Sequence, residues 1–152
     1  MDLFKKYITK STQETENLGA KTADYLKLFR KGAYPIICLY GSLGVGKTIF
    51  VRGFLHNIGI KGRILSPTYI FLRQYKNFLN ESVYHYDLYR LKDPSDLENL
   101  GYFEIFSLPK FYILIEWADK MGDYLPKNRL DIIFEHIDNK YRQITINYMG
   151  NI

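Results

Sequence analysis

The sequence predicts a three-layer α/β domain whose sheet is mixed, parallel in the middle and antiparallel at its C-terminal end. Two continuous apolar runs, PIICLY at 35–40 and FYILIEW at 111–117, are typical of strands buried on both faces. Helical patterns lie between the strand-like segments, and this alternation favours helices on both faces of a sheet. Near the C-terminus, 129–137 and 141–148 alternate apolar and polar residues around the turn signal DNK, which predicts a β-hairpin.

The N-terminal part predicts a strand followed by a helix. Residues 3–9 are expected to form a short strand at the edge of the sheet. Ser11 and Glu14 have the spacing of a capping box, although Thr12 could cap the helix instead. From there an amphipathic pattern continues to about Arg30.

The middle of the chain predicts one helix, two strands and a short helical segment. The helix follows the first apolar strand and a glycine-rich loop, and it ends near Asn57. Segments 67–75 and 83–91 are rich in aromatic and β-branched residues, which is typical of strands. An Asp-Pro pair at 93–94 begins a short helix that ends at Gly101.

The composition is that of one soluble domain. The chain has 152 residues and no linker-like or low-complexity tract, so residues 1–152 are expected to form a single domain. No apolar run approaches the roughly 18 residues of a membrane helix, and the N-terminus lacks the apolar core of a secretory signal. We therefore expect a cytoplasmic protein. The net charge of +5 favours acidic partners such as nucleotides or RNA, although the basic residues are scattered.

The stretch GSLGVGKT, residues 41–48, has the pattern of a phosphate-binding P-loop: Gly, four residues, then Gly-Lys-Thr. Glycines let backbone N–H groups point at phosphate oxygens, and the following helix presents its positive N-terminal end to the same phosphates. Lys47 is expected to reach the β- and γ-phosphates, and the Thr48 hydroxyl to bind Mg²⁺. The preceding buried strand and the following helix supply the context that this motif requires. The sequence therefore predicts a P-loop NTPase fold, against the simpler alternative of a glycine turn with a surface lysine.

Three polar residues outside the loop are further candidates for this site. Glu116 ends the apolar strand YILIE, where a carboxylate can hold Mg²⁺ directly or through water; Asp is more usual there, and a surface ion pair is the alternative. Thr68 in SPTY could sense the γ-phosphate or simply open a strand after a Ser-Pro turn. Asp87 in YHYDLYR is costly to bury without a partner, so it could orient the attacking water, support the magnesium shell, or pair with Arg90.

Several motifs are missing from the sequence. No Asn-Lys-x-Asp segment is present to read guanine, which favours ATP over GTP. No arginine-rich lid of the kind found in small-molecule kinases is evident, and no Cys/His spacing resembles a zinc site. The lone histidines, His85 among them, are expected to be packing or surface residues.

The order of the motifs is more specific than the loop alone. The segments are YGSLGVGKTIFVRGFL, SPTYIFLRQY, VYHYDLYRL, LENLGYFEIF, ILIEWADK and LPKNRLDIIFE. In this order they resemble the TsaE family, the bacterial ATPases of tRNA threonylcarbamoyladenosine synthesis. One departure is Ser42, where an acidic residue is common in the family.

The resemblance implies a function that spacing alone does not show. Members of the family work with two protein subunits, TsaD and TsaB, which transfer a threonylcarbamoyl group to N6 of adenosine 37 in tRNA. The ATPase does not perform that transfer; its Mg²⁺-dependent hydrolysis of ATP, weak without the partners, resets the TsaD–TsaB complex between rounds. It meets tRNA through the complex.

The resemblance and the loop pattern together define the candidate site. Thr48 and Glu116 are the expected metal ligands, and Lys47, Asp87 and Thr68 are the candidate catalytic residues. The expected nucleotide contacts are Thr12, Gly41, Leu43, Gly44, Val45, Gly46, Lys47, Thr48, Asp87 and Arg142.

Two other functions remain open from the sequence. A small-molecule P-loop kinase would need a substrate pocket and lid arginines. A nucleotide-dependent RNA-binding module would bind tRNA tightly and with strong salt dependence as the isolated chain.

Overall fold

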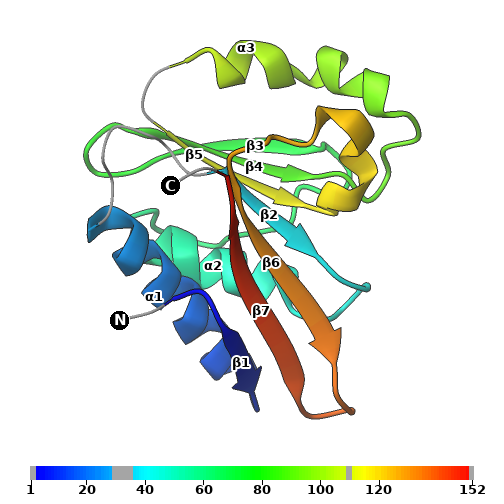
Figure 1. Cartoon of the computed structure of the whole chain (residues 1–152). Coiled ribbons are helices and arrows are strands. Elements are labelled where there is room, and N and C mark those ends of the chain that lie inside the picture. Colours follow the sequence, from blue (N-terminus) through cyan, green and yellow to red (C-terminus); the bar gives the residue numbers. More distant parts are fainter. Residues whose placement is uncertain (1–2, 29–35, 109–110, 151–152) are drawn as a thin grey trace.

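The computed structural model describes residues 3–28, 36–108 and 111–150, and it places them in three layers (Figure 1). A seven-stranded sheet forms the middle layer, in the order β1-β7-β6-β2-β5-β4-β3. Its strands are β1 (Lys6–Thr9), β2 (Ile36–Tyr40), β3 (Leu72–Lys76), β4 (Ser82–Asp87), β5 (Phe111–Glu116), β6 (Arg129–His136) and β7 (Arg142–Met149). The predicted three-layer α/β class is confirmed.

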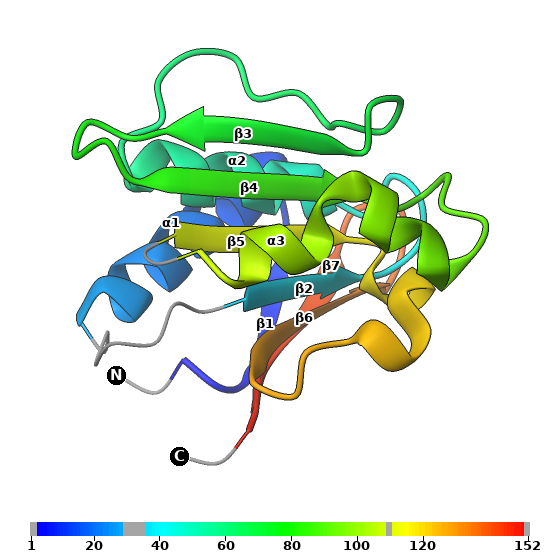
Figure 2. The ribbon, with the colours of Figure 1, turned by 90° about the horizontal axis from the view of Figure 1, so that it is seen from above.

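Helices cover both faces of the sheet, and Figure 2 shows α2 and α3 on opposite sides of it. The helices are α1 (Thr12–Leu28), α2 (Lys47–Asn57) and α3 (Tyr102–Phe106), with the 3₁₀ helices η1 (Pro94–Leu100) and η2 (Ala118–Tyr124). One hydrophobic core lies between the sheet and α1 and α2, and a second lies under η1, α3 and η2. No helix in the described ranges combines the length and the apolar character that crossing a membrane requires.

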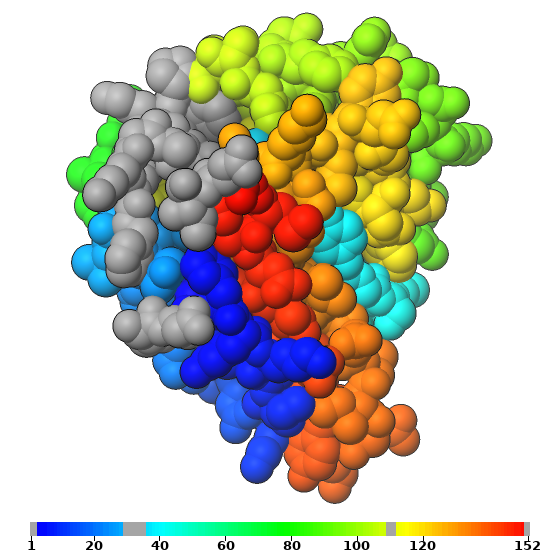
Figure 3. Space-filling model, viewed as in Figure 1, coloured from blue at the N-terminus to red at the C-terminus, as the bar shows by residue number. Residues whose placement is uncertain are grey.

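The sheet is parallel at its centre and antiparallel at both ends. Strand β2 lies between β5 and β6 and runs parallel to both, and β4 runs parallel to β5. Strands β6 and β7 form the predicted C-terminal hairpin, and β1 pairs with β7 at the edge, where Figure 3 shows them side by side. Strands β3 and β4 were predicted, but their antiparallel pairing at the opposite edge of the sheet was not.

The first helix begins as its capping sequence predicts. The Ser11 hydroxyl accepts a hydrogen bond from the Glu14 backbone N–H at 3.1 Å. The Glu14 carboxylate reaches back to the N–H of Lys10 at 2.7 Å. Ser11, and not Thr12, is therefore the cap. The helix is described as far as Leu28, so its predicted end near Arg30 lies outside the described residues.

Three of the predicted strands are shorter than expected. The N-terminal strand, predicted over 3–9, spans only Lys6–Thr9. Within 67–75, the first residues form a turn in which Phe71 N–H donates to Pro67 O at 2.6 Å, and Phe71 takes a positive φ of 63°. Strand β4 ends at Asp87, because the Asp87 side chain accepts from the Tyr89 N–H at 3.0 Å and bends the chain. Aromatic and β-branched composition does not distinguish such turns from strands.

Helix α2, which follows the glycine-rich loop, crosses α1 at two glycines. A Cβ on Gly19 would overlap the backbone carbonyl of Phe50, and one on Gly53 would overlap that of Glu16. Neither glycine position has room for a side chain, so the backbones of α1 and α2 pack directly against each other at this crossing. The contact fixes the direction of α2, and with it the position of the loop at its N-terminus.

We expect Gly53→Ala to destabilise the protein. Inserting a methyl group where no space exists typically costs about 1–3 kcal/mol or more, because both helices must shift. Chemical denaturation should show a lower free energy of unfolding. The control is Lys21→Ala, which removes an exposed side chain from α1 and should leave the midpoint nearly unchanged. Equal denaturation midpoints for Gly53→Ala and Lys21→Ala would contradict the close packing of the two helices.

Candidate functional site

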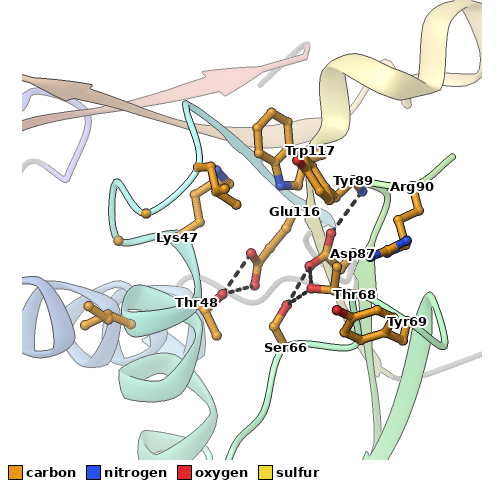
Figure 4. A pocket seen from close by; sticks show the side chains of 14 residues that line it. Lys47, Thr48, Ser66, Thr68, Tyr69, Asp87, Tyr89, Arg90, Glu116 and Trp117 are labelled. Carbon is orange, nitrogen blue, oxygen red and sulfur yellow. Dashed lines mark hydrogen bonds between the residues drawn. The ribbon is translucent and has the colours of Figure 1, made fainter.

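A pocket of about 340 Å³ lies at the carboxyl ends of β2, β4 and β5 (Figure 4). Its wall is built by the glycine-rich loop and the start of α2, by the segment 66–69, and by residues at the ends of β4 and β5. The crevice beyond the carboxyl ends of parallel strands is where open α/β sheets bind ligands. Residues distant in the sequence therefore meet where the sequence predicted, at the carboxyl ends of the parallel strands.

The loop takes a shape that requires its glycines. Gly41, Gly44 and Gly46 have φ angles of 142°, 74° and 114°, a region that other residues rarely adopt. A Cβ on Gly41 would lie 2.7 Å from the carbonyl oxygen of Phe134, so no side chain fits there. Helix α2 begins directly after Gly46, and its N-terminal end is therefore at the pocket.

Lys47 is held inside the loop. Its ammonium donates to the carbonyl oxygens of Gly41 at 2.6 Å and of Ser42 at 2.9 Å. The same Nζ atom lies 4.1 Å from the centre of the Trp117 ring. Burial lowers the pKa of Lys47, and the neighbouring carboxylate of Glu116 opposes that shift. Among the described residues, the direct partners of this buried cation are neutral groups, and such a cation is suited to an anionic ligand.

Thr48 and Glu116 are in direct contact. The Thr48 hydroxyl lies 2.9 Å from both carboxylate oxygens of Glu116, which is 2% exposed. The contact arises because β2 and β5 are parallel neighbours, with Leu39 paired to Glu116 just before the loop. Glu116 is therefore a buried residue of the site and not a surface ion pair. Its second partner is His85, whose Nε2 lies 2.8 Å from Glu116 Oε1.

Asp87 is the second carboxylate of the pocket and lies beside Glu116 in the β4–β5 pairing. It accepts hydrogen bonds from the hydroxyls of Ser66 at 2.5 Å and Thr68 at 2.7 Å, as well as from the Tyr89 N–H. These hydroxyls explain how the carboxylate is buried, with 2% of its surface exposed.

Arg90 is not the partner of Asp87 that the sequence left open. Its guanidinium lies 4.3 Å from the centre of the Tyr69 ring. Across the described residues no ion pair joins it to Asp87. The hydroxyls at 66 and 68 take the place of a cation.

Arg142 and Thr12, the two predicted nucleotide contacts outside the loop and the central strands, differ in their position relative to the pocket. Arg142, at the start of β7, donates to the Thr15 hydroxyl at 3.3 Å, and a Cβ on Gly46 would meet its Nε at 3.4 Å. Arg142 therefore lies against the loop. Thr12 is in the first turn of α1 and does not line the pocket, although a Cβ on Gly46 would lie 3.6 Å from Cγ2 of Thr15, one turn later. Their roles as nucleotide contacts stay predictions.

Three contributors to the site were missed from the sequence. His85 was expected to be a packing or surface residue, and Ser66 and Tyr89 were given no role. The signal that could have identified His85 is its spacing from Asp87: residues two apart on a strand share a face, so both must lie on the side of the sheet that carries the loop helix.

The donor set fits magnesium better than zinc. One hydroxyl and one carboxylate leave most positions around a cation to phosphate oxygens and water, as Mg²⁺ prefers. Within the described ranges, no group of three or more His, Cys, Asp or Glu side chains gathers as a metal cage.

The parallel-centred sheet, the glycine loop between β2 and α2, and the lysine and threonine that begin α2 define a P-loop NTPase-like protein. The structure of this chain superimposes on the crystal structure of YdiB from Bacillus subtilis with a TM-score of 0.73, at 27% identity, over 96% of this chain and 86% of the other. The model of the family described as threonylcarbamoyl adenosine biosynthesis protein TsaE matches residues 9–144, and the chain belongs to that family.

Relatives with the name "tRNA threonylcarbamoyladenosine biosynthesis protein TsaE" support the same conclusion. The one from Haemophilus influenzae is 36% identical over 121 residues, which are 80% of this chain and 75% of the relative. The one from Bacillus subtilis is 34% identical over 146 residues, covering 96% of this chain and 87% of the relative. The resemblance drawn from the motifs is confirmed.

Proposed function

We propose that this protein is a Mg²⁺-dependent ATPase of tRNA threonylcarbamoyladenosine biosynthesis. The observation that carries the proposal is the contact between the Thr48 hydroxyl and the Glu116 carboxylate at the end of the P-loop, with Asp87 on the adjacent strand. The names of its relatives support the pathway. ATP is the proposed nucleotide because the guanine-reading segment is missing from the sequence.

In this proposal each residue has a separate task. The backbone N–H groups of the loop and the ammonium of Lys47 bind the β- and γ-phosphates. Thr48 and Glu116 hold the metal ion, which when bound neutralises charge on the phosphates. Asp87, held in one orientation by its three donors, orients the attacking water and accepts its proton. Thr68 lines the same pocket and donates to Asp87, and it would sense the γ-phosphate of a bound nucleotide.

Hydrolysis is proposed to serve a complex with the TsaD and TsaB subunits. The chain resets that complex between rounds of tRNA modification and does not transfer the threonylcarbamoyl group itself. It meets tRNA indirectly, through its partners. Such a role needs no large substrate cavity beside the pocket at the carboxyl ends of the strands.

The experiment that tests the proposal mixes the chain with TsaD and TsaB, with and without ATP or GTP, and measures complex formation and ADP release. We expect partner-stimulated hydrolysis of ATP in preference to GTP. A small-molecule kinase would instead release ADP in step with a phosphorylated product. An RNA-binding module would bind tRNA alone, with an affinity that falls steeply with salt. Either result would replace the proposed function.

We expect Glu116→Gln and Thr48→Ala each to weaken the response to magnesium. Each substitution removes one of the few protein ligands, so the half-saturating Mg²⁺ concentration for nucleotide binding should rise by about tenfold or more. Calorimetric titration of nucleotide at a series of Mg²⁺ concentrations measures it. Binding in EDTA, which does not use these ligands, is the control. An unchanged magnesium response in both variants would show that the ligands lie elsewhere.

A further inference from the structure

His85 is a buried polar residue that the proposed mechanism does not use. It lies on β4, where side chains alternate between the two faces of the sheet. Val83 belongs to the core under α1 and α2, whereas Tyr84 and Tyr86 belong to the opposite core. His85 therefore faces α2, on the same side as Asp87 and below the pocket, and none of its surface is exposed.

The hydrogen bonds of His85 define its tautomer. Its Nε2 lies 2.8 Å from Oε1 of Glu116, and because a carboxylate only accepts, Nε2 carries the proton and donates. The other ring nitrogen, Nδ1, is buried and has no hydrogen-bond partner within the described residues. A proton on Nδ1 would be left without an acceptor, whereas a proton on Nε2 has one in Glu116 Oε1.

This hydrogen bond acts on only one oxygen of Glu116. Among the residues that the structure describes, Oε1 is bonded by both His85 and Thr48, whereas Oε2 is bonded by Thr48 alone. With Oε1 anchored by His85, the carboxylate is held with both of its oxygens 2.9 Å from the Thr48 hydroxyl. Glu has one more rotatable bond than the Asp more usual at this position, and each freely rotating bond costs entropy when it is ordered. A donor that fixes the longer side chain reduces that cost.

We propose that His85 is the positioning residue of Glu116: its Nε2–H holds the carboxylate in the orientation that binds the metal ion. The inference rests on the proposed function, because it assigns Glu116 to magnesium. His85 does not line the pocket and acts only through Glu116. Partners of this kind orient metal ligands in many proteins, and their loss typically costs about 10–100-fold in metal affinity.

Two amide substitutions separate positioning from packing. In His85→Gln the side-chain N–H₂ extends about as far as Nε2, so it can still donate to Glu116 Oε1. In His85→Asn the amide is too short to reach that oxygen, although it is equally polar. Magnesium titrations of ADP binding, followed by calorimetry below the unfolding temperature of every variant, provide a readout that does not depend on hydrolysis.

We expect His85→Asn to raise the half-saturating Mg²⁺ concentration by about tenfold or more, and His85→Gln to restore most of that loss. The affinity for ADP in EDTA should be the same in both variants and the unmutated protein. In a Glu116→Gln background, His85→Asn should cause no further change, because the residue acts through that carboxylate. If His85→Asn does not fold, His85→Met, which has similar length and no donor, provides the same comparison with His85→Gln.

The outcomes distinguish this inference from the function on which it rests. Equal magnesium responses in the Gln, Asn and unmutated proteins would overturn the role of His85 and leave the magnesium site standing. An undiminished effect of His85→Asn in the Glu116→Gln background would overturn it as well. If ADP binding by the unmutated protein does not respond to Mg²⁺, both the inference and the proposed metal site are wrong.

Discussion

Replacing Lys47 by methionine is expected to abolish most ATP hydrolysis without destabilising the fold. Lys47 has a buried ammonium whose partners are two carbonyl oxygens and the face of Trp117. Without it, the phosphates lose a charge-assisted hydrogen bond worth about 1.5–3 kcal/mol, or roughly 10–100-fold in affinity. Loss of a cation that stabilises developing charge typically costs about another 10²–10³-fold in rate.

The stability measurement makes this test specific. Burial lowers the pKa of Lys47, so the folded protein holds its charge at a cost, and methionine keeps the length of the side chain without that charge. Thermal unfolding of Lys47→Met should therefore begin no lower than that of the unmutated protein. Lys47→Ala shortens the side chain as well and shows what the loss of packing adds. Hydrolysis of Mg-ATP by Lys47→Met at the unmutated rate would exclude the loop lysine from the reaction.

Replacing Asp87 by asparagine is expected to separate nucleotide binding from hydrolysis. The substitution keeps the shape of the side chain and one acceptor for the Tyr89 N–H, while the hydroxyls of Ser66 and Thr68 can rotate to accept from the new amide. ATP should still bind, and the variant should still join TsaD and TsaB. Hydrolysis should fall by about 10²–10⁴-fold, the usual contribution of a general base. Repeated rounds of tRNA modification should fail because hydrolysis is lost.

A purely structural role for Asp87 gives a different pair of results. The carboxylate ties the segment 66–68 to the end of β4, so its loss would lower the unfolding temperature, and turnover would fall only in proportion to the folded fraction. Thermal unfolding and partner-stimulated hydrolysis should be recorded on the same sample. Ser66→Ala, which removes one donor but leaves the carboxylate, is the matched control. Normal hydrolysis per folded Asp87→Asn molecule would rule out the catalytic role.

Local patterns were sufficient to predict the central part of the fold. The apolar run before the loop, the glycine spacing and the following helix are all within one stretch of chain, and β2, the loop and α2 form as expected. The hairpin of β6 and β7 also follows from a two-residue alternation and a turn signal next to each other in the sequence. The contact of Thr48 with Glu116 was predictable because the carboxyl ends of parallel neighbouring strands meet at one edge.

Other contacts between distant segments were not predictable in the same way. The sequence placed Arg90 within reach of Asp87, but the hydroxyls of 66 and 68 satisfy that carboxylate instead. The bond from His85 to Glu116 depends on the register of β4 against β5, in which His85 pairs with Leu114. Register is decided by the packing of both faces together, and no property of either strand alone specifies it.

The open sheet also has a consequence for self-association. Its edges are β1 and β3, and an edge strand presents unpaired backbone groups on which another copy can add a strand. Both edges are basic: Lys6 lies on β1, and Arg73 and Lys76 lie on β3. Two copies that approach edge to edge therefore repel each other before their backbones can pair. Salt weakens this protection, since the screening length falls from about 10 Å at 0.1 M to about 3 Å at 1 M. The basic excess thus opposes the growth of the sheet from one molecule into the next.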